Sequence, residues 1–597
     1  MGDPPGKLSE LEQTVVDAIS IEEPWSLLET FSELNRISGS RDEEKAAEYI
    51  TDRLDNFGVG FERYDPELYI SQPNRASIEV VGKPFRTGPV KPVAFSASKS
   101  IEAEVEYVGE AGASDVGKSD DTSSQYHAVD TGQPYSDVDE KDIEGKIALT
   151  AAGSLSIRAS RILERKGAVG VIAIHPHDRE PHSGIATSVW GGAPRLDERH
   201  RIPAIPIANV TSPTGDHLKM WAEDGLEIEL ETDVTTDWFE CPVIEAQIAG
   251  GAASGSDEFV LLHGHYDSWA VGITDNATGD AGLLEIARVL SNHSDELERD
   301  IRIAWWPAHS TGRYAGSTWY ADEFAQELVD NCVAHFNMDS PGAAGSEEYV
   351  DMACWMPELH GLVGSAIADV TGADYEENRP RRAGDYSFNN LGLSGAFTLS
   401  SNIPAEVRDQ EGWHPVGGCG GNADAWHLST DTLDTAGKDE LLRDIRMYAV
   451  CLLRVLTADV LPFDHVRNVE RHKEIVHSYD ELAGEHYDFG PTLAELDALQ
   501  KELVAFYDEA GDEISENEAN RTIKAVGQIL TRLNFSSRGS FEQDPAHRRP
   551  SYPRYAPTRK FDTLGPSSDE YHFLKLQLKR EQNTVVQELK DARRQLE

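Results

Sequence analysis

The chain of 597 residues is too long for one ordinary hydrophobic core, so we expect about two to four domains. Its 105 acidic residues outnumber its 54 basic residues, which gives a formal net charge of -51. A charge of this sign disfavours nucleic acid and anionic membranes as partners. Because the acidic residues are spread along the chain, we interpret them as a surface adapted to high salt, where a Debye length of about 3 Å at 1 M screens repulsion. An acidic surface without this adaptation is the alternative.

The five cysteines are scattered and have no CxxC spacing, so the sequence predicts neither a disulfide framework nor a thiolate zinc site. The first residues, MGDPPGKLSELEQTVVDAIS, contain no basic start followed by an apolar segment. No stretch of the chain reaches the roughly 18 apolar residues of a membrane-spanning helix. We therefore expect a soluble cytoplasmic protein.

Different patterns follow one another along the chain. In residues 43–58, apolar residues at helical spacing and a closing glycine predict a surface helix. From about 96 to 240, short β-type runs such as EAEVEYVG and VGVIAIH enclose one helical segment and predict an inserted β-rich module. Strands and helices alternate from 241 to 460, and 461–597 shows the pattern of long amphipathic helices.

The alternating segment predicts an α/β fold, in which a mixed, mainly parallel sheet has helices on both faces. We expect residues 1–95 to form the N-terminal part of this domain and residues 96–240 to be inserted into it. Residues 241–460 then form its metal-binding part, and residues 461–597 form a helical domain. Ligands of such sheets bind beyond the carboxyl ends of the strands.

Candidate metal ligands follow several of the expected strands. His265 and Asp267 end an apolar strand, and Asp275 lies in the glycine-rich turn before the next helix. Asp339 ends a later strand, and His427 lies in a loop before the last helix of the α/β part. Imidazole and carboxylate are the ligands of catalytic zinc sites, and Asp267 is suited to accept the second ring N–H of His265. Taken singly, each residue has a structural alternative as a hydrogen-bonded histidine or a turn and cap residue.

Several motifs together resemble the two-zinc exopeptidase family that includes bacterial aminopeptidases, glutamate carboxypeptidase II and the transferrin receptor. These motifs are HGHYDSW, ITDNATGDAGLLEIAR, AGSTWYAD, FNMDS and WHLSTDTLD. The resemblance implies the zinc exopeptidase fold and identifies the insert with a protease-associated domain. LPFD and YPRYAPT resemble landmarks of the C-terminal dimerisation domain, which implies a homodimer formed through the helical domain.

The resemblance also implies roles for individual residues. His265 and Asp339 would hold one zinc ion, Asp275 would bridge two, and His427 would belong to the second. Trp426 stands where some relatives have a tyrosine that supports the oxyanion, and its indole N–H is a donor that could replace the hydroxyl.

The family's paired glutamates, which are the general base and a ligand of the second zinc, fall on His309 and Ser310. Without them the site is more positive, so we expect one firmly bound zinc, a weaker second one and a more acidic metal-bound water. We favour His309 as a ligand of the second metal beside Asp275 and His427, with a catalytic role as general base as the other reading. A purely structural His309 in a vestigial or mononuclear site is the alternative.

The sequence thus predicts a metal-dependent exopeptidase, an aminopeptidase or a carboxypeptidase, that hydrolyses small peptides. A non-catalytic binding or scaffold protein, as the transferrin receptor is within this family, is the main alternative, and chemistry on another amide is a third. Residues 379–390, RPRRAGDYSFNN, are expected to line the substrate pocket through Asp385 or Tyr386, although a solvated basic loop is equally consistent.

Overall fold

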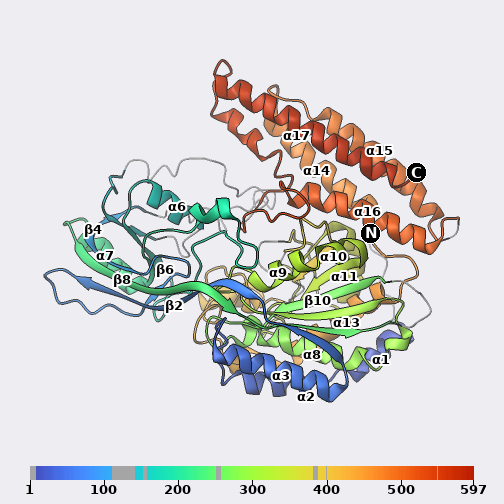
Figure 1. Ribbon diagram of the computed structural model, residues 1–597, viewed down its shortest axis with the longest axis horizontal. Helices are drawn as coiled ribbons and strands as arrows, with labels where there is room; N and C mark the ends of the chain where they lie inside the picture. Colours follow the sequence, from blue (N-terminus) through green and yellow to red (C-terminus); the bar gives the residue numbers. More distant parts are fainter. Residues whose placement is uncertain are drawn as a thin grey trace.

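The computed structural model describes residues 8–109, 141–151, 157–250, 257–380, 387–398, 400–511, 513–546 and 549–597 (Figure 1). Its first sheet has seven strands in the order β1-β9-β11-β10-β12-β14-β13. These strands are β1 (Gly60–Tyr64), β9 (Val243–Ile248), β11 (Asp300–Trp306), β10 (Phe259–His265), β12 (Cys332–Asn337), β14 (Gly395–Thr398) and β13 (Cys354–Trp355). The four strands β11, β10, β12 and β14 pair in parallel, whereas β1, β9 and β13 pair antiparallel at the two edges. The predicted mixed sheet is confirmed, with its parallel pairs confined to the centre.

Helices cover both faces of this sheet, as predicted. Alternate residues of β10 show why, since Val260 and Leu262 belong to one apolar cluster and Phe259 and Leu261 to another. The first face carries α1 (Glu10–Ala18), α2 (Glu22–Phe31), α3 (Arg41–Phe57), α8 (Thr278–Leu290), α11 (His360–Val370) and α13 (Lys438–Leu456). The second face carries α9 (Ala315–Glu323) and α10 (Ala325–Asn331). A strand buried on both faces explains the continuous apolar run in the sequence of β10.

A second seven-stranded sheet lies beside the first, at the left of Figure 1, in the order β2-β8-β4-β5-β6-β7-β3. Its strands are β2 (Glu67–Val80), β8 (Glu227–Glu240), β4 (Lys99–Tyr107), β5 (Ile147–Thr150), β6 (Gly170–His175), β7 (Ile207–Thr211) and β3 (Val90–Pro92), with helices α6 (Ile157–Arg165) and α7 (Ser212–Ala222). Because β2 pairs with β8 along its whole length, this sheet begins at Glu67, before the boundary expected at residue 96.

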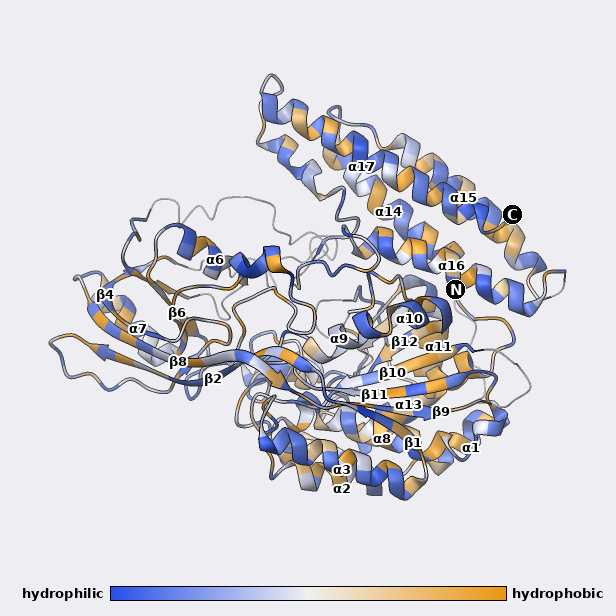
Figure 2. Ribbon diagram, in the orientation of Figure 1, coloured by the Kyte–Doolittle hydropathy of each residue, from blue (hydrophilic) through white to orange (hydrophobic). Residues whose placement is uncertain are grey.

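Residues 461–597 form long helices, as their sequence pattern predicts. They are α14 (His465–Ala483), α15 (Gly490–Glu509), α16 (Glu516–Phe535) and α17 (Asp569–Arg594). Apolar and polar residues alternate along each of these helices (Figure 2), and the apolar faces meet in one cluster that also contains Tyr552 and Tyr555. Among the described residues, the other helices include the short α12 (Ala405–Glu411) and several single turns.

In the part of the chain that the structure describes, no helix is both long and apolar enough to cross a membrane. All five cysteines lie in that part, where each is buried and none forms a disulfide bond.

Glu358 is a buried carboxyl group, 1% exposed, in the turn η5 (Pro357–Leu359) before α11. Its Oε1 accepts a hydrogen bond from Ser394 Oγ at 2.7 Å, but burial raises the pKa of Glu358 to about 7. The unfolded chain would release this proton near the ordinary value of 4.5. The contribution of Glu358 to the free energy of unfolding therefore falls as pH rises from the lower to the higher value.

We predict that Glu358→Gln removes this pH dependence. The stability of the variant relative to the natural chain should rise by about 3 kcal/mol between pH 4 and pH 8, because a pKa difference of one unit corresponds to about 1.4 kcal/mol. Urea unfolding across this pH range measures the difference. The exposed Glu48→Gln is the control, and equal pH profiles for Glu358→Gln and the natural chain would contradict the prediction.

Candidate metal centre

The carboxyl ends of the parallel strands bring most of the predicted residues to one edge of the first sheet. His265 is the last residue of β10, and Asp339 follows β12 by two residues. His309 lies in the turn between β11 and α9, and Asp275 lies in the helical turn η3 (Ile273–Ala277) that leads into α8. His427 reaches the same place from a long loop before α13.

The His265 ring has one nitrogen satisfied by the backbone and one that faces carboxylates. Its Nδ1 lies 3.0 Å from the carbonyl oxygen of Asp267, to which only an N–H can donate. Its Nε2 lies 3.3 Å from Asp275 Oδ1 and 3.7 Å from Asp339 Oδ1. Among the residues described, this buried Nε2 has no hydrogen-bond partner. A ring nitrogen that faces two carboxylates at these distances is stable only with a proton or a cation between them, and a divalent cation meets that requirement.

The pKa values of His265 and Asp275 also indicate that this group of side chains favours a positive charge among its carboxylates. Burial acts to lower the pKa of His265, but the neighbouring carboxylates of Asp267, Asp275 and Asp339 raise it well above 6.5. Burial acts to raise the pKa of Asp275, but the imidazoles of His265 and His427 hold it well below 3.8. The group therefore favours ionised carboxylates together with a neighbouring cation.

The carboxylate of Asp275 lies between two imidazoles. Its Oδ1 faces His265, and its Oδ2 lies 3.3 Å from His427 Nε2. The other ring nitrogen of His427, Nδ1, lies 3.3 Å from the carbonyl oxygen of Ser183, which belongs to the insert. Both histidines thus hold Nδ1 against a carbonyl and present Nε2 to the same carboxylate, an arrangement that suits a bridging ligand.

His309 lies beside His265. The two rings are stacked, with centroids 3.8 Å apart and planes 12° from parallel. Ligand atoms of His265, His309 and Asp339 all lie within 4.8 Å of one another, so the three could hold one ion. From the sequence we expected His309 to be a ligand of the second metal beside Asp275 and His427. In the structure its ring lies with His265 and Asp339, because the turn after β11 lies next to the end of β10.

Asp267 serves this turn through its side chain. Its buried carboxylate accepts hydrogen bonds from the backbone N–H of His309 at 2.8 Å and of Ser310 at 2.9 Å. The expected orienting contact to His265 is made mainly by the backbone carbonyl of Asp267, since its carboxylate oxygen lies 3.7 Å from Nδ1. One residue therefore fixes both the ring of His265 and the backbone that carries His309.

Three further residues that the sequence analysis gave no role hold the ligand-bearing loops. The Asp431 carboxylate accepts hydrogen bonds from the backbone N–H of Thr274 at 2.9 Å and of Asp275 at 3.0 Å. Asn276 donates to the carbonyl of Met338 at 2.9 Å and accepts from the N–H of Ser340 at 2.9 Å, so it ties the two loops around Asp339 and Asp275 together.

Arg36 is the third of these residues. Its fully buried guanidinium donates to the carbonyls of Tyr266, Val271 and Gly272, at 2.7, 2.7 and 2.9 Å. It therefore fixes the loop between His265 and Asp275. Because Arg36 is far from this loop in the sequence, no local pattern predicts its contacts. Asp431 is different, since it follows His427 by only four residues and could have been noticed there.

Of the residues expected to bind substrate, the structure describes Trp426 but not Asp385 or Tyr386. Trp426 is half-buried, and its ring centroid lies 4.1 Å from that of His427, so its proximity to the site is seen while its role stays a prediction. Asp385 and Tyr386 lie outside the described residues. Ser310 is buried in the same turn as His309 and provides no carboxylate.

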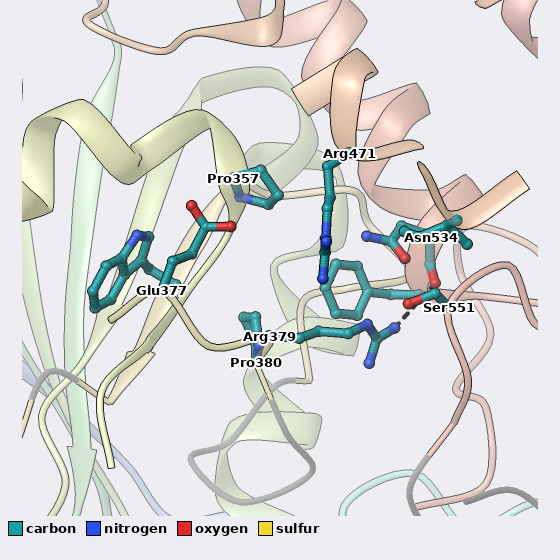
Figure 3. Close-up of a pocket in the computed structure, with 10 residues that line it drawn as sticks. Pro357, Glu377, Arg379, Pro380, Arg471, Asn534 and Ser551 are labelled. Atoms are coloured by element: carbon teal, nitrogen blue, oxygen red, sulfur yellow. Dashed lines mark hydrogen bonds between the residues drawn. The ribbon is translucent and has the colours of Figure 1, made fainter. Parts of the chain in front are cut away.

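A pocket between the α/β part and the helical domain contains none of the candidate metal ligands (Figure 3). Arg379 and Arg471 extend along it, and Arg379 donates to the carbonyl of Asn534 at 3.1 Å. Its guanidinium also lies 4.1 Å from the ring centre of Phe535. These contacts join the two parts of the chain.

The insert also supports the turn that carries His309. The N–H of Ser71 donates to the carbonyl of Thr311 at 2.9 Å, and the N–H of Gly191 donates to that of Gly312 at 2.9 Å. At Gly192 the two segments approach so closely that an added Cβ would lie 2.0 Å from the carbonyl oxygen of Ala315.

We predict that Gly192→Ala destabilises the fold by about 1–3 kcal/mol, because the insert and the turn must separate to admit the methyl group. The midpoint of urea unfolding in molar salt measures this loss. Gly60→Ala is the matched control, since an added Cβ there meets nothing within 4 Å. Equal midpoints for the two variants would show that this close approach is absent.

Comparison with known proteins relates the chain to peptidases. Residues 244–450 match the model of Peptidase family M28. Leucine aminopeptidase 2 of Trichophyton equinum is 25% identical over 236 residues, which are 35% of this chain and 44% of that protein. Probable glutamate carboxypeptidase LAMP1 of Arabidopsis thaliana is 24% identical over 331 residues, 52% of this chain and 46% of that protein. The chain thus spans less than half the length of these curated relatives.

Solved structures support the fold. The aminopeptidase from Aneurinibacillus sp. strain AM-1 superimposes with a TM-score of 0.54 at 21% identity, over 74% of this chain and 96% of that one. BSAP, a zinc aminopeptidase from Bacillus subtilis, superimposes with a TM-score of 0.52 at 18% identity, over 72% and 94%. Over residues 244–450 the chain therefore matches Peptidase family M28, and the resemblance to zinc exopeptidases predicted from its motifs is confirmed.

Proposed function

We propose that the chain is a metal-dependent exopeptidase that hydrolyses small peptides. The observation that carries this proposal is the His265 Nε2, which is buried, has no hydrogen-bond partner among the described residues and faces the carboxylates of Asp275 and Asp339. Neutral imidazole and carboxylate are a donor set that suits zinc. When bound, zinc supplies polarisation of a carbonyl group and acidification of a water molecule.

The proposed ligands divide between two positions. His265 and Asp339 would hold the first ion, Asp275 would bridge, and His427 would belong to the second. Because Ser310 gives the second position no carboxylate of its own, we propose one firmly held zinc and a weaker second one.

His309 is proposed as an additional ligand of the first ion, which the grouping of its ring nitrogen with His265 and Asp339 supports. A general base is its other reading, since an imidazole suits proton transfer near neutral pH. In either role its position depends on Asp267, which holds the backbone of the turn by two hydrogen bonds. Trp426 is proposed to face the substrate beside His427, and its indole N–H would donate to a developing oxyanion.

The end of the peptide that is attacked stays open, since one relative is named an aminopeptidase and another a probable carboxypeptidase. Asp385 and Tyr386 remain proposed pocket residues. The protease-associated identity of the insert, the homodimer through the helical domain, the cytoplasmic location and the high-salt surface likewise remain predictions from the sequence. Light scattering in molar salt tests the homodimer.

We predict hydrolysis of short peptides or aminoacyl anilides in molar salt, with loss of activity after chelation and recovery on adding zinc. The physical reason is that a zinc ion between His265 and the carboxylates of Asp275 and Asp339 would supply the polarisation of the carbonyl group and the acidification of water, which a proton there cannot supply. Kinetic assays with metal analysis on the same sample measure both. Turnover that persists after complete zinc removal would rule out the proposed mechanism.

Substitution of the two histidines should separate the two positions. We predict that His265→Ala lowers zinc uptake at the first position at least tenfold, whereas His427→Ala affects only the second. Metal content after dialysis at a fixed free zinc concentration measures each. His200→Ala, an exposed histidine of the insert, is the control. Equal losses in His265→Ala and His427→Ala would contradict the division.

A non-catalytic binding protein is the second candidate, because His309 and Ser310 stand in place of the family's paired glutamates. The variant His309→Glu with Ser310→Glu distinguishes the two functions. Activity in the natural chain supports the peptidase, and activity that arises only in the double variant supports the binding protein.

A further inference from the structure

A short segment of the insert, residues 177–183, lies across the loop that carries His427. We name these residues, HDREPHS, the strap. The strap is anchored at three points to the sheet and helix beside it. Asn209 of β7 donates to the carbonyl of His182 at 2.8 Å, Ser212 at the start of α7 donates to that of His177 at 3.2 Å, and Lys91 of β3 pairs with Glu180 at 2.7 Å. It is therefore a fixed part of the insert.

The strap also binds the loop of residues 424–429. His177 Nε2 lies 2.9 Å from the carboxylate of Asp424. Glu180 Oε2 accepts hydrogen bonds from the backbone N–H of Ser429 at 3.1 Å and from its hydroxyl at 2.6 Å. The loop is thus held on both sides of His427 by residues more than 240 positions earlier in the chain.

At the centre of the strap, two residues contact the His427 ring itself. The carbonyl of Ser183 lies 3.3 Å from Nδ1 and can accept a ring N–H there, so in a neutral ring it favours the tautomer whose Nε2 lone pair faces the second metal position beside Asp275. The ring of His182 stacks on that of His427, with centroids 4.5 Å apart and planes 27° from parallel. His182 is 6% exposed. One contact fixes the tautomer of His427 and the other fixes the plane of its ring.

We propose that the strap is the positioning element of the second metal position, with His182 and Glu180 as its principal side chains. This inference rests on the proposed function, which supplies the metal. The second position has Asp275 and His427 but no carboxylate from Ser310, so its affinity depends strongly on how well His427 is held. The insert therefore controls occupancy of the second position, while the first depends on β10, β11 and β12.

Zinc titration by calorimetry in molar salt tests this role without measuring activity. In His182→Ala and in Glu180→Gln, we expect the affinity of the weaker position to fall about tenfold or more, with the tighter one unchanged. Glu231→Gln is the matched control, because this insert carboxylate is exposed and pairs with Arg75 at 3.0 Å, away from the strap. His182→Phe keeps a stacked ring and should bind nearly as the natural chain does.

Unchanged zinc affinities in His182→Ala and Glu180→Gln would overturn the inference, and so would a natural chain that takes up a single ion. Equal weakening in His182→Phe and His182→Ala would overturn the stacking role. Circular dichroism of each variant shows whether it is folded, and Glu180→Gln provides a test that does not open a cavity. A natural chain that binds two ions but hydrolyses no peptide would reject the proposed function and leave the role of the strap intact.

Discussion

The hydrogen bonds from the backbone of His309 and Ser310 to the buried carboxylate of Asp267 hold the candidate site together. Asp267 follows β10 and the turn follows β11, so this contact joins the ends of two neighbouring parallel strands. Its backbone carbonyl also accepts from His265 Nδ1, which leaves Nε2 free to meet a cation. A carboxylate buried this deeply must be paired, and here its pairing determines where the nearest imidazoles lie.

The charges of the surrounding carboxylates and imidazoles explain why the rest of the site depends on the position of His265. Asp275 and Asp339 face His265 from two other loops, and Asp275 also faces His427. Carboxylates and imidazoles so close together are stable only when a proton or a metal ion lies among them. Asp431, Asn276 and Arg36 hold the surrounding loops by backbone hydrogen bonds, so the ligands are already in place before an ion binds. The insert completes this arrangement on the side of His427.

Strand ends were the part of the site that the sequence could predict. His265 and Asp339 follow apolar runs of strand length, and a parallel sheet brings such ends to one edge. The grouping of His309 with His265 and Asp339 was not predicted, because its neighbours are set by the pairing of β10 with β11 and no local pattern encodes that pairing. The sequence also did not predict that Asp267 uses its backbone carbonyl for His265 and its carboxylate for the turn that carries His309. The contacts between Glu180 and Ser429 join segments 249 residues apart, so no local sequence pattern could predict them. The second sheet begins at Glu67, before the boundary expected at residue 96, because β2 pairs with β8 along its length and this long-range pairing has no local sequence signal.

Anomalous diffraction at the zinc absorption edge, from crystals grown in molar salt with zinc, tests the central claim most directly. We expect a strong peak bounded by His265 Nε2 and the carboxylates of Asp275 and Asp339, with the His309 ring beside it, and a weaker peak between Asp275 and His427. Absence of a peak next to His265, with zinc bound elsewhere or not at all, would contradict it.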